Sequence, residues 1–440
     1  MDLTGSKAFT RRAFLNRGLT LASATVTIPA FLQSSASVFA QQHAAPGGGG
    51  TVDRILVVVQ LSGGNDGLNT VVPFGDPAYY AARPSIGIAE RDVLKLAKNG
   101  KGDGLGLHPR LTGLKELYDD GRLTVVQGVG YPNPNRSHFK SMDIWHTGDT
   151  TGTGDGWLGR YFDNQCSGAP RGASTRGAGG CSGHDGVALG RTAPLAMQGR
   201  GFRPIAFESA DLFRWTGEDA GDAEARAYEV MTGGGLRPGA DPDSAEGFLL
   251  RTTLDAQVAS EKIREAVRRT PLVEYPRTGL GRELAMVASM IRAGLLTRVY
   301  YVSHGGFDTH AGQGGPQGSH ANLLDQFAAA VRAFYRDLDA SGDSQRVLTV
   351  SFSEFGRRVG QNGSGGTDHG TAAPMFLMGP MVRPGVIGNH PSLTDLDQGD
   401  LKFSVDFRSV YAGVLEDWMR TDAAAVLGRK FPAAKVVRGA

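Results

Sequence analysis

Arg298-Val-Tyr-Tyr-Val-Ser-His-Gly-Gly-Phe-Asp-Thr-His310 is the stretch that decides the fold. Its first part, from Val299 to Val302, is rich in β-branched and aromatic residues, which is typical of a buried strand. Apolar residues at helical spacing precede and follow it: Leu284, Val287, Ile291 and Leu295, then Leu324, Phe327, Val331, Phe334 and Leu338. This order of helix, strand, loop and helix predicts a parallel sheet, and ligands of such sheets bind beyond the carboxyl ends of the strands.

Two polar residues follow this strand on a loop that Gly305 and Gly306 allow to turn tightly. Asp308 and His310 offer a carboxylate and an imidazole that can converge on one cation. The alternative is that both side chains only satisfy backbone groups of the loop. This pair by itself leaves both interpretations open.

Other predicted strands end in similar loops. A nearly continuous apolar run at residues 54–61 predicts a strand covered on both faces, and Asp66 lies just beyond it. An aspartate that only bonds its own turn is the alternative there. A strand at residues 347–352 leads to Glu354, and Asp368 and His369 lie on a nearby loop.

A predicted strand at residues 123–127 leads through a proline-rich loop to Ser137 and His138, at the start of a predicted helix. Serine is a favoured helix N-cap, which gives Ser137 a purely structural interpretation. A helix N-terminus beside Arg136 and His138 is also where an anion binds and a nucleophile is activated. The sequence leaves these two interpretations open.

Together, these loops bring Ser, Asp, Glu and His side chains to the carboxyl edge of one sheet, as in an oxygen- and nitrogen-ligated divalent metal site. The candidate metal ligands are Asp66, Asp308, His310, Glu354, Asp368 and His369, and the candidate catalytic residues are Ser137 and His138. Zn²⁺ or Mn²⁺ suits this donor set better than Mg²⁺ or Ca²⁺, with one or two ions bound.

The first 40 residues have the three parts of an export signal. Thr10-Arg-Arg-Ala-Phe-Leu15 is a twin-arginine pattern, an apolar segment runs from Leu19 to Leu32, and Val38-Phe-Ala40 ends the region with a small residue. The apolar segment is too short and too polar to span a bilayer stably. We therefore expect a Tat signal peptide at 1–40, a flexible linker at 41–52, and a periplasmic or secreted protein.

Residues 53–440 are long enough for one large α/β domain with insertions. The Gly- and Arg-rich range of about 150–280, with predicted helices at 223–231 and 245–268, is interpreted as a helical and loop insertion over one end of the sheet. No later segment is long and apolar enough to be transmembrane. The net charge of +2 gives no indication of a nucleic-acid partner or an anionic membrane surface.

The chain contains two cysteines, Cys166 and Cys181, within this range. In an oxidising compartment they can form a disulfide. Two unpaired loop thiols are the alternative, and no neighbouring His or Cys cluster indicates zinc.

Five motifs occur in one order along the chain: Leu61-Ser-Gly-Gly-Asn-Asp-Gly-Leu-Asn-Thr-Val-Val-Pro73, Asn135-Arg-Ser-His-Phe139, Gly305-Gly-Phe-Asp-Thr-His310, Ser353-Glu-Phe-Gly-Arg357 and Asp368-His-Gly370. They resemble those of a bacterial family of Tat-exported proteins, domain-of-unknown-function family 1501, in the alkaline phosphatase and sulfatase superfamily. The resemblance implies an alkaline-phosphatase-like three-layer α/β sandwich with a mostly parallel central sheet. It also implies two metals and a Ser, Thr or formylglycine nucleophile.

Carried over by position, the resemblance makes Asp66 the metal aspartate of the first strand and Ser137 the nucleophile. It makes Asp308, His310 and His369 the ligands of one metal. The chain departs from alkaline phosphatases after the penultimate strand, where Glu-Phe replaces Asp-His, so a second metal would lose an imidazole. The spacing of the aspartate and histidine after the earlier strand is also shorter than in the phosphatases.

Two functions remain from the sequence. The first is an exported metal-dependent hydrolase of phosphate or sulfate esters, in which Ser137 attacks an ester or an anionic polymer substrate. The second is a non-catalytic envelope protein that retains the fold and binds a polymer or a partner. The retained Asp, Ser and His positions favour the hydrolase, and the missing imidazole favours the binding protein.

Replacing both Arg11 and Arg12 with Lys should leave the precursor in the cytoplasm, because the Tat pathway reads the arginine pair itself. Immunoblots of cytoplasmic and exported fractions measure this directly. Export that continues undiminished would remove the Tat interpretation.

Overall fold

The structure is a computed structural model that describes residues 54–96, 104–166, 185–209 and 262–439. At its centre, the described residues form a nine-stranded sheet in the order β11-β5-β10-β9-β1-β8-β6-β7, with β14 also paired to β5. The strands are β1 (Ile55–Leu61), β5 (Leu123–Gly130), β6 (Gly186–Leu189), β7 (Ile205–Phe207), β8 (Val299–His304), β9 (Val347–Phe352), β10 (Ala373–Met378), β11 (Gly385–Ile387) and β14 (Val405–Asp406).

The sheet is mostly parallel, as predicted. Strand β10 runs antiparallel to both of its neighbours, β5 and β9, and the other pairs of this sheet are parallel. Strands β5 and β9 therefore point the same way as β1 and β8. The carboxyl ends of these four strands lie at one edge of the sheet, where the candidate site residues begin.

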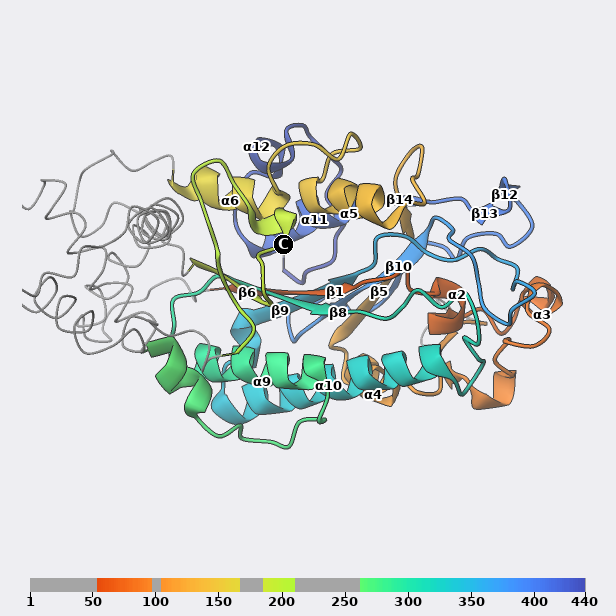
Figure 1. The fold of residues 1–440 in the computed structure, drawn as a ribbon, viewed down its shortest axis with the longest axis horizontal. Coiled ribbons are helices and arrows are strands. Elements are labelled where there is room, and N and C mark those ends of the chain that lie inside the picture. The colour runs from red at the N-terminus through yellow and green to blue at the C-terminus, as the bar shows by residue number, and fades with distance from the viewer. Residues whose placement is uncertain (1–53, 97–103, 167–184, 210–261, 440) are drawn as a thin grey trace, which may run out of the picture.

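Helices cover both faces of the sheet and make a mixed α/β fold of three layers (Figure 1). One face carries α4 (Thr112–Asp119), α9 (Gly279–Arg292) and α10 (Ser319–Ser341). The other carries α5 (His138–Thr147), α6 (Trp157–Cys166), α11 (Phe407–Gly413) and α12 (Ala423–Leu427). The three-layer α/β architecture expected from the sequence is thus confirmed.

Strand β1 shows why a continuous apolar run suits this position. Val57 and Val59 pack into the core with α9 and α10, whereas Leu56 and Val58 pack into the core with α5 and α11. Successive side chains of a strand point to opposite faces, so a strand covered on both faces needs apolar residues at every position.

The helices predicted on either side of the strand at 299–302 are also present. In α9 and α10 the apolar residues at helical spacing face the sheet, and Val287 and Phe327 are fully buried. Asp406 caps α11 by accepting a hydrogen bond from the Arg408 N–H at 2.9 Å. The chain then continues as a π-helix, η6 (Val414–Trp418), which keeps Trp418 buried.

Shorter elements complete the described chain. They are α2 (Gly67–Thr70), β2 (Val71–Val72), α3 (Pro77–Ala82), η1 (Glu90–Asp92), β3 (Leu94–Lys95), β4 (Gly106–Leu107), η3 (Leu195–Met197), η5 (Ser344–Arg346), β12 (Leu396–Asp397) and β13 (Asp400–Leu401). Strands β2, β4 and β3 form one small sheet, and β12 and β13 form a two-stranded ribbon.

The range expected to be an insertion contributes to the central sheet. Strand β6 pairs with β8, and β7 pairs with β6, so this part of residues 150–280 extends the sheet beyond β8. Residues 262–268 are helical, at the end of one predicted helix. Several predictions lie outside the described residues. They are the signal peptide, the linker, the helix at 223–231, residues 245–261 of the second predicted helix, and the pairing of the two cysteines.

No helix in the described ranges combines the length and apolarity needed to cross a membrane.

Asp66 and Arg83 form a fully buried ion pair beside the first strand. Asp66 Oδ2 lies 2.5 Å from an Arg83 guanidinium nitrogen and accepts a second hydrogen bond, also 2.5 Å long, from Gln313 Nε2. Burial raises the pKa of the Asp66 carboxyl, but Arg83 more than offsets this and holds the pKa below its usual range. Arg83 also donates to the carbonyl oxygens of Arg358 and Val359, both at 2.9 Å. The pair therefore ties α2 and α3 to the segment after β9.

Replacing Asp66 with Asn should lower the free energy of unfolding by about 3–5 kcal/mol, because it leaves the buried Arg83 charge without its partner. Urea denaturation followed by circular dichroism measures this. Asp395→Asn is the matched control, since Asp395 and Lys402 form an exposed pair and stability should barely change. A loss for Asp66→Asn as small as that of the control would contradict the structural role of the pair.

Candidate metal centre

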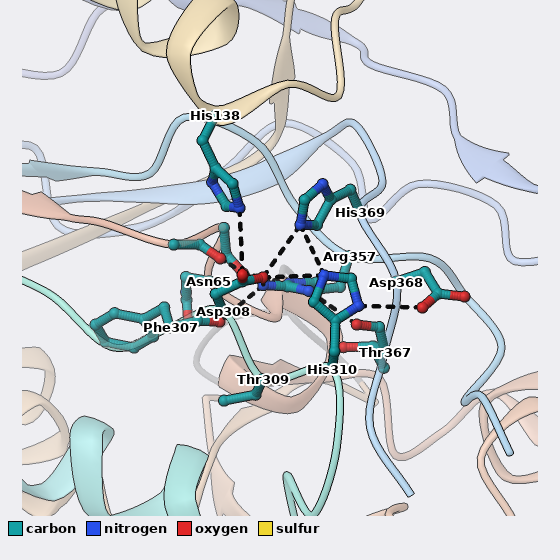
Figure 2. A network of polar contacts seen from close by, with 12 residues as sticks. Asn65, His138, Phe307, Asp308, Thr309, His310, Arg357, Thr367, Asp368 and His369 are labelled. Carbon is teal, nitrogen blue, oxygen red and sulfur yellow. Dashed lines mark hydrogen bonds and ion pairs between the residues drawn. The ribbon is translucent and has the colours of Figure 1, made fainter. Parts of the chain in front are cut away.

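Four of the candidate residues meet at the carboxyl edge of the sheet (Figure 2). Asp308 and His310 lie on the loop after β8, His369 lies on the loop between β9 and β10, and His138 is the first residue of α5. We call this group the His/Asp cluster. Its members come from three separate segments, which the parallel sheet brings to one edge.

The distances within the cluster are short. The Nε2 atoms of His310 and His369 each lie 3.1 Å from Asp308 Oδ1 and are 2.9 Å from each other. His138 Nε2 lies 3.5 Å from Asp308 Oδ2. Ligand atoms of His138, Asp308 and His369 all fall within 4.8 Å of one another, which is close enough to share a metal ion.

The second nitrogen of each imidazole already has an acceptor. His138 Nδ1 lies 2.7 Å from Glu354 Oε1, and His310 Nδ1 lies 3.2 Å from Asp368 Oδ1. His369 Nδ1 lies 2.8 Å from the carbonyl oxygen of Arg136. A carboxylate or carbonyl oxygen only accepts, so these contacts assign the proton of each neutral ring to Nδ1. Each Nε2 then presents a lone pair to the cluster.

This arrangement fits a divalent cation. The three Nε2 atoms and the Asp308 carboxylate converge, and in this tautomer no Nε2 atom has a proton to donate to the carboxylate. His138 Nε2 is also buried and has no hydrogen-bond partner among the described residues. Imidazole and carboxylate donors suit Zn²⁺ or Mn²⁺. A histidine ligand whose other nitrogen donates to a carboxylate or a carbonyl is also the usual arrangement around such a metal.

Arg357 holds the aspartate of the cluster in place. Its buried guanidinium donates to Asp308 Oδ1 at 2.7 Å and to the carbonyl oxygens of Gly64, Phe307 and Thr367 at 2.7, 3.0 and 2.8 Å. Burial raises the pKa of Asp308, but the hydrogen bond and the charge of the Arg357 guanidinium act against it, and the pKa is about 2. Asp308 is therefore an anion at neutral pH. The sequence analysis missed Arg357, whose only signal is its place at the end of a motif.

Glu354 and Asp368 lie behind the imidazoles. Glu354 is buried, and its Oε1 accepts from the Gly63 N–H at 2.9 Å as well as contacting His138. Asp368 contacts His310, and a hydrogen bond from Asn362 Nδ2 at 3.1 Å lowers its pKa. Both carboxylates orient a histidine in this structure, and neither lies among the converging atoms.

Asp66 is not brought to the cluster. Its carboxylate is taken up by Arg83, Gln313 and the N–H of Leu68, as described above. Asp66, which the resemblance makes the metal aspartate of the first strand, is thus neutralised by a buried arginine. Glu354, another candidate ligand, is bonded to a histidine.

Ser137 is exposed and occupies the N-cap position of α5, directly before His138. Its side chain makes no hydrogen bond to the first turn of the helix, so the Ser137 hydroxyl does not cap α5. Its own N–H donates to Asn135 Oδ1 at 2.8 Å. The structure also gives His138 a position among the candidate ligands, whereas the sequence indicated a catalytic role.

Solved structures with similar folds are distant from this chain. The crystal structure of Ps i-CgsB in complex with k-i-k-neocarrahexaose is 13% identical with a TM-score of 0.35, over 86% of this chain and 73% of that chain. The C-terminal periplasmic domain of EcEptC from Escherichia coli, in complex with Zn, is 11% identical with a TM-score of 0.34, over 75% and 74%. The PsFucS1 sulfatase from Pseudoalteromonas sp. is 11% identical with a TM-score of 0.30, over 77% and 64%. These scores are too low for the likeness to carry an argument.

In a sequence comparison, no curated protein matches the chain. Residues 124–427 match the family model described as "Protein of unknown function (DUF1501)". This match spans more than half of the chain and includes every residue of the His/Asp cluster. The chain therefore belongs to the DUF1501 family, as its motifs indicated.

Proposed function

We propose that the protein is an exported metal-dependent hydrolase of phosphate or sulfate esters, with a divalent cation, Zn²⁺ or Mn²⁺, bound by the His/Asp cluster. One observation carries the proposal. Three imidazole nitrogens converge on an anionic carboxylate, and the opposite nitrogen of each ring is already bonded to an acceptor. The twin-arginine pattern supports export.

The contacts of Asp66 and Glu354 support one bound ion and argue against two. Asp66 is paired with Arg83, and Glu354 is bonded to His138 and to the Gly63 N–H. A second ion would have to displace these contacts. Releasing Arg83 would leave a buried charge without a partner, which is strongly unfavourable.

The residues around the cluster are suited to an ester anion. A divalent ion bound there would supply Lewis-acid polarisation of the ester and stabilise developing negative charge. The first N–H groups of α5 have no partner within the helix, and the helix dipole favours an anion at that end. Ser137 lies at this helix end beside His138, and we assign its hydroxyl as the nucleophile. Its oxygen would attack the phosphorus or sulfur atom, the bond to the alcohol would break, and the serine proton would pass through solvent to the departing alkoxide. Water would then hydrolyse the seryl ester and restore Ser137.

One observation favours the alternative, a non-catalytic envelope protein that binds a metal and a polymer. Within the described ranges, no side chain is hydrogen-bonded to the Ser137 hydroxyl to accept its proton. The alternative therefore remains as an outcome of the activity test below.

The wild-type protein, isolated from the compartment to which it is exported, should contain one divalent ion per chain by elemental analysis. His369→Ala should lose most of this metal, because it removes a donor atom. Glu354→Gln should keep the ligands but bind the metal about 10–100-fold more weakly, because the His138 ring loses its carboxylate partner. Asp66→Asn should retain the wild-type stoichiometry and serves as the control.

A chelator should lower the melting temperature of the wild type but not that of His369→Ala, because a metal bound to the folded state adds to its stability. Unchanged metal content in His369→Ala would show that His369 is not a ligand. Loss of metal in an Asp66→Asn variant that circular dichroism shows to be folded would restore Asp66 to the ligand set.

Replacing Ser137 with Asn should abolish ester hydrolysis and preserve the fold, because Asn is a good N-cap but offers no hydroxyl. The assay is turnover of aryl phosphate monoesters, phosphodiesters and aryl sulfates with added Zn²⁺ or Mn²⁺. Thr278→Asn is the matched control, since Thr278 is the N-cap of α9 and its hydroxyl accepts from the Gly281 N–H at 3.1 Å.

Turnover that survives in Ser137→Asn would reject Ser137 as the nucleophile. No turnover by the wild type across the whole panel, with the metal bound, would favour the non-catalytic envelope protein.

A further inference from the structure

A groove of about 700 Å³ adjoins the His/Asp cluster. Its walls come from the β5–α5 loop, the β9–β10 loop and the segment around β12 and β13. Two of its residues also contact the cluster. Arg136 accepts the hydrogen bond from His369 Nδ1 on its carbonyl oxygen, and the Phe355 ring centroid lies 4.9 Å from that of His138 and 4.7 Å from that of His369. The groove and the cluster therefore share a wall.

The size of the groove exceeds what an ester anion needs. Pockets of about 300–1,000 Å³ enclose drug-sized ligands, and a phosphate or sulfate group is much smaller. An ester whose anionic group lies at the His/Asp cluster would leave this volume for the remainder of the substrate. The lining of the groove therefore indicates the chemistry of that remainder.

The charges in the groove wall balance. Arg136 and Asp400 are paired with each other, and Lys402 is paired with Asp395, so neither cation of the lining is left to bind an anion. Asp400 is buried, with Oδ2 bonded to Arg136 and Oδ1 lying 3.8 Å from Arg358 Nε. A polyanionic chain would meet two carboxylates here, so the balance favours a neutral ligand.

Two amide side chains line the groove from strained backbone positions. Asn133 has a φ of 55° and Gln398 a φ of 51°, in the left-handed region that favours glycine. No hydrogen bond of either side chain occurs in the described structure. Each amide offers donors and an acceptor, which match the mixed donor and acceptor character of hydroxyl groups. Non-glycine residues held in this conformation are concentrated at ligand-binding sites.

Aromatic rings complete the lining. Tyr131 and Phe355 line the groove, and Phe403, also on its wall, is 38% exposed. Large exposed apolar side chains that adjoin a pocket indicate a ligand with an apolar face. A pyranose ring combines such a C–H face with hydroxyl groups along its edge, and aromatic rings bind the former.

We propose that this groove binds the neutral sugar portion of the substrate, a short oligosaccharide that carries the phosphate or sulfate ester. The assignment of the ester group rests on the proposed hydrolase function. The assignment of the sugar rests on the groove itself. Asn133 and Gln398 bind hydroxyl groups, and Phe403 packs on the face of a sugar ring.

The test is isothermal titration calorimetry of the full chain with neutral gluco-, galacto- and manno-oligosaccharides, and with oligogalacturonates as the anionic comparison. At least one neutral series should bind, and should bind equally well in the presence of a chelator. Asn133→Gly and Gln398→Gly should each weaken binding about tenfold, the effect of one lost hydrogen bond of ordinary strength. Glycine adopts these φ values without strain, so both variants should fold. Thr394→Ala, exposed on the loop before β12 and outside the groove, should bind like the wild type.

Failure to bind any neutral saccharide, preference for the oligogalacturonates, or unchanged affinity in both glycine variants would overturn the proposal. These outcomes are separate from those of the activity test. A wild type that hydrolyses aryl esters but binds no saccharide would reject the groove assignment alone. A wild type that binds saccharides but hydrolyses nothing would reject only the hydrolase.

Discussion

The guanidinium of Arg357 is the contact on which the candidate site depends. It is buried at the point where three loops meet, and it donates to carbonyl oxygens after β1, after β8 and on the loop after β9. A buried cation needs a counter-charge, and Asp308 supplies it. The same contact fixes the carboxylate on which the imidazoles converge and keeps it ionised. The packing of the loops and the charge of the site therefore have one physical origin.

The third imidazole of the site belongs to His138, and its position explains how the site differs from the one expected. The family resemblance led to the expectation that Glu354 would cost a second metal its imidazole. In the structure Glu354 is buried and contacts His138, which is the first residue of α5. Glutamate in that place supports a histidine, and the histidine faces Asp308. Replacing Asp-His by Glu-Phe is thus compatible with one compact site of three imidazoles and one carboxylate.

Sequence patterns predicted what depends on local periodicity. Strand β1 and the helices on either side of β8 follow from the burial of apolar residues within short segments. The meeting of Asp308, His310 and His369 followed from the rule that parallel strands end at one edge. The ion pair of Asp66 with Arg83 could not be predicted, because Arg83 lies 17 residues away and contacts Asp66 only through the position of α3. Strands β6 and β7 were missed because they are short and lie in a glycine-rich range.

The His/Asp cluster and the groove would bind different parts of the proposed substrate by different interactions: the cluster the ester anion, and the groove the sugar. At the cluster, an anion would meet a divalent cation and the amino end of α5, so charge dominates its binding. In the groove the charged side chains cancel, and two amide side chains and the exposed ring of Phe403 remain. Binding there would depend on the arrangement of hydroxyl groups and little on net charge. This division allows a bare inorganic anion to be released easily after hydrolysis, because only the intact ester engages both parts at once.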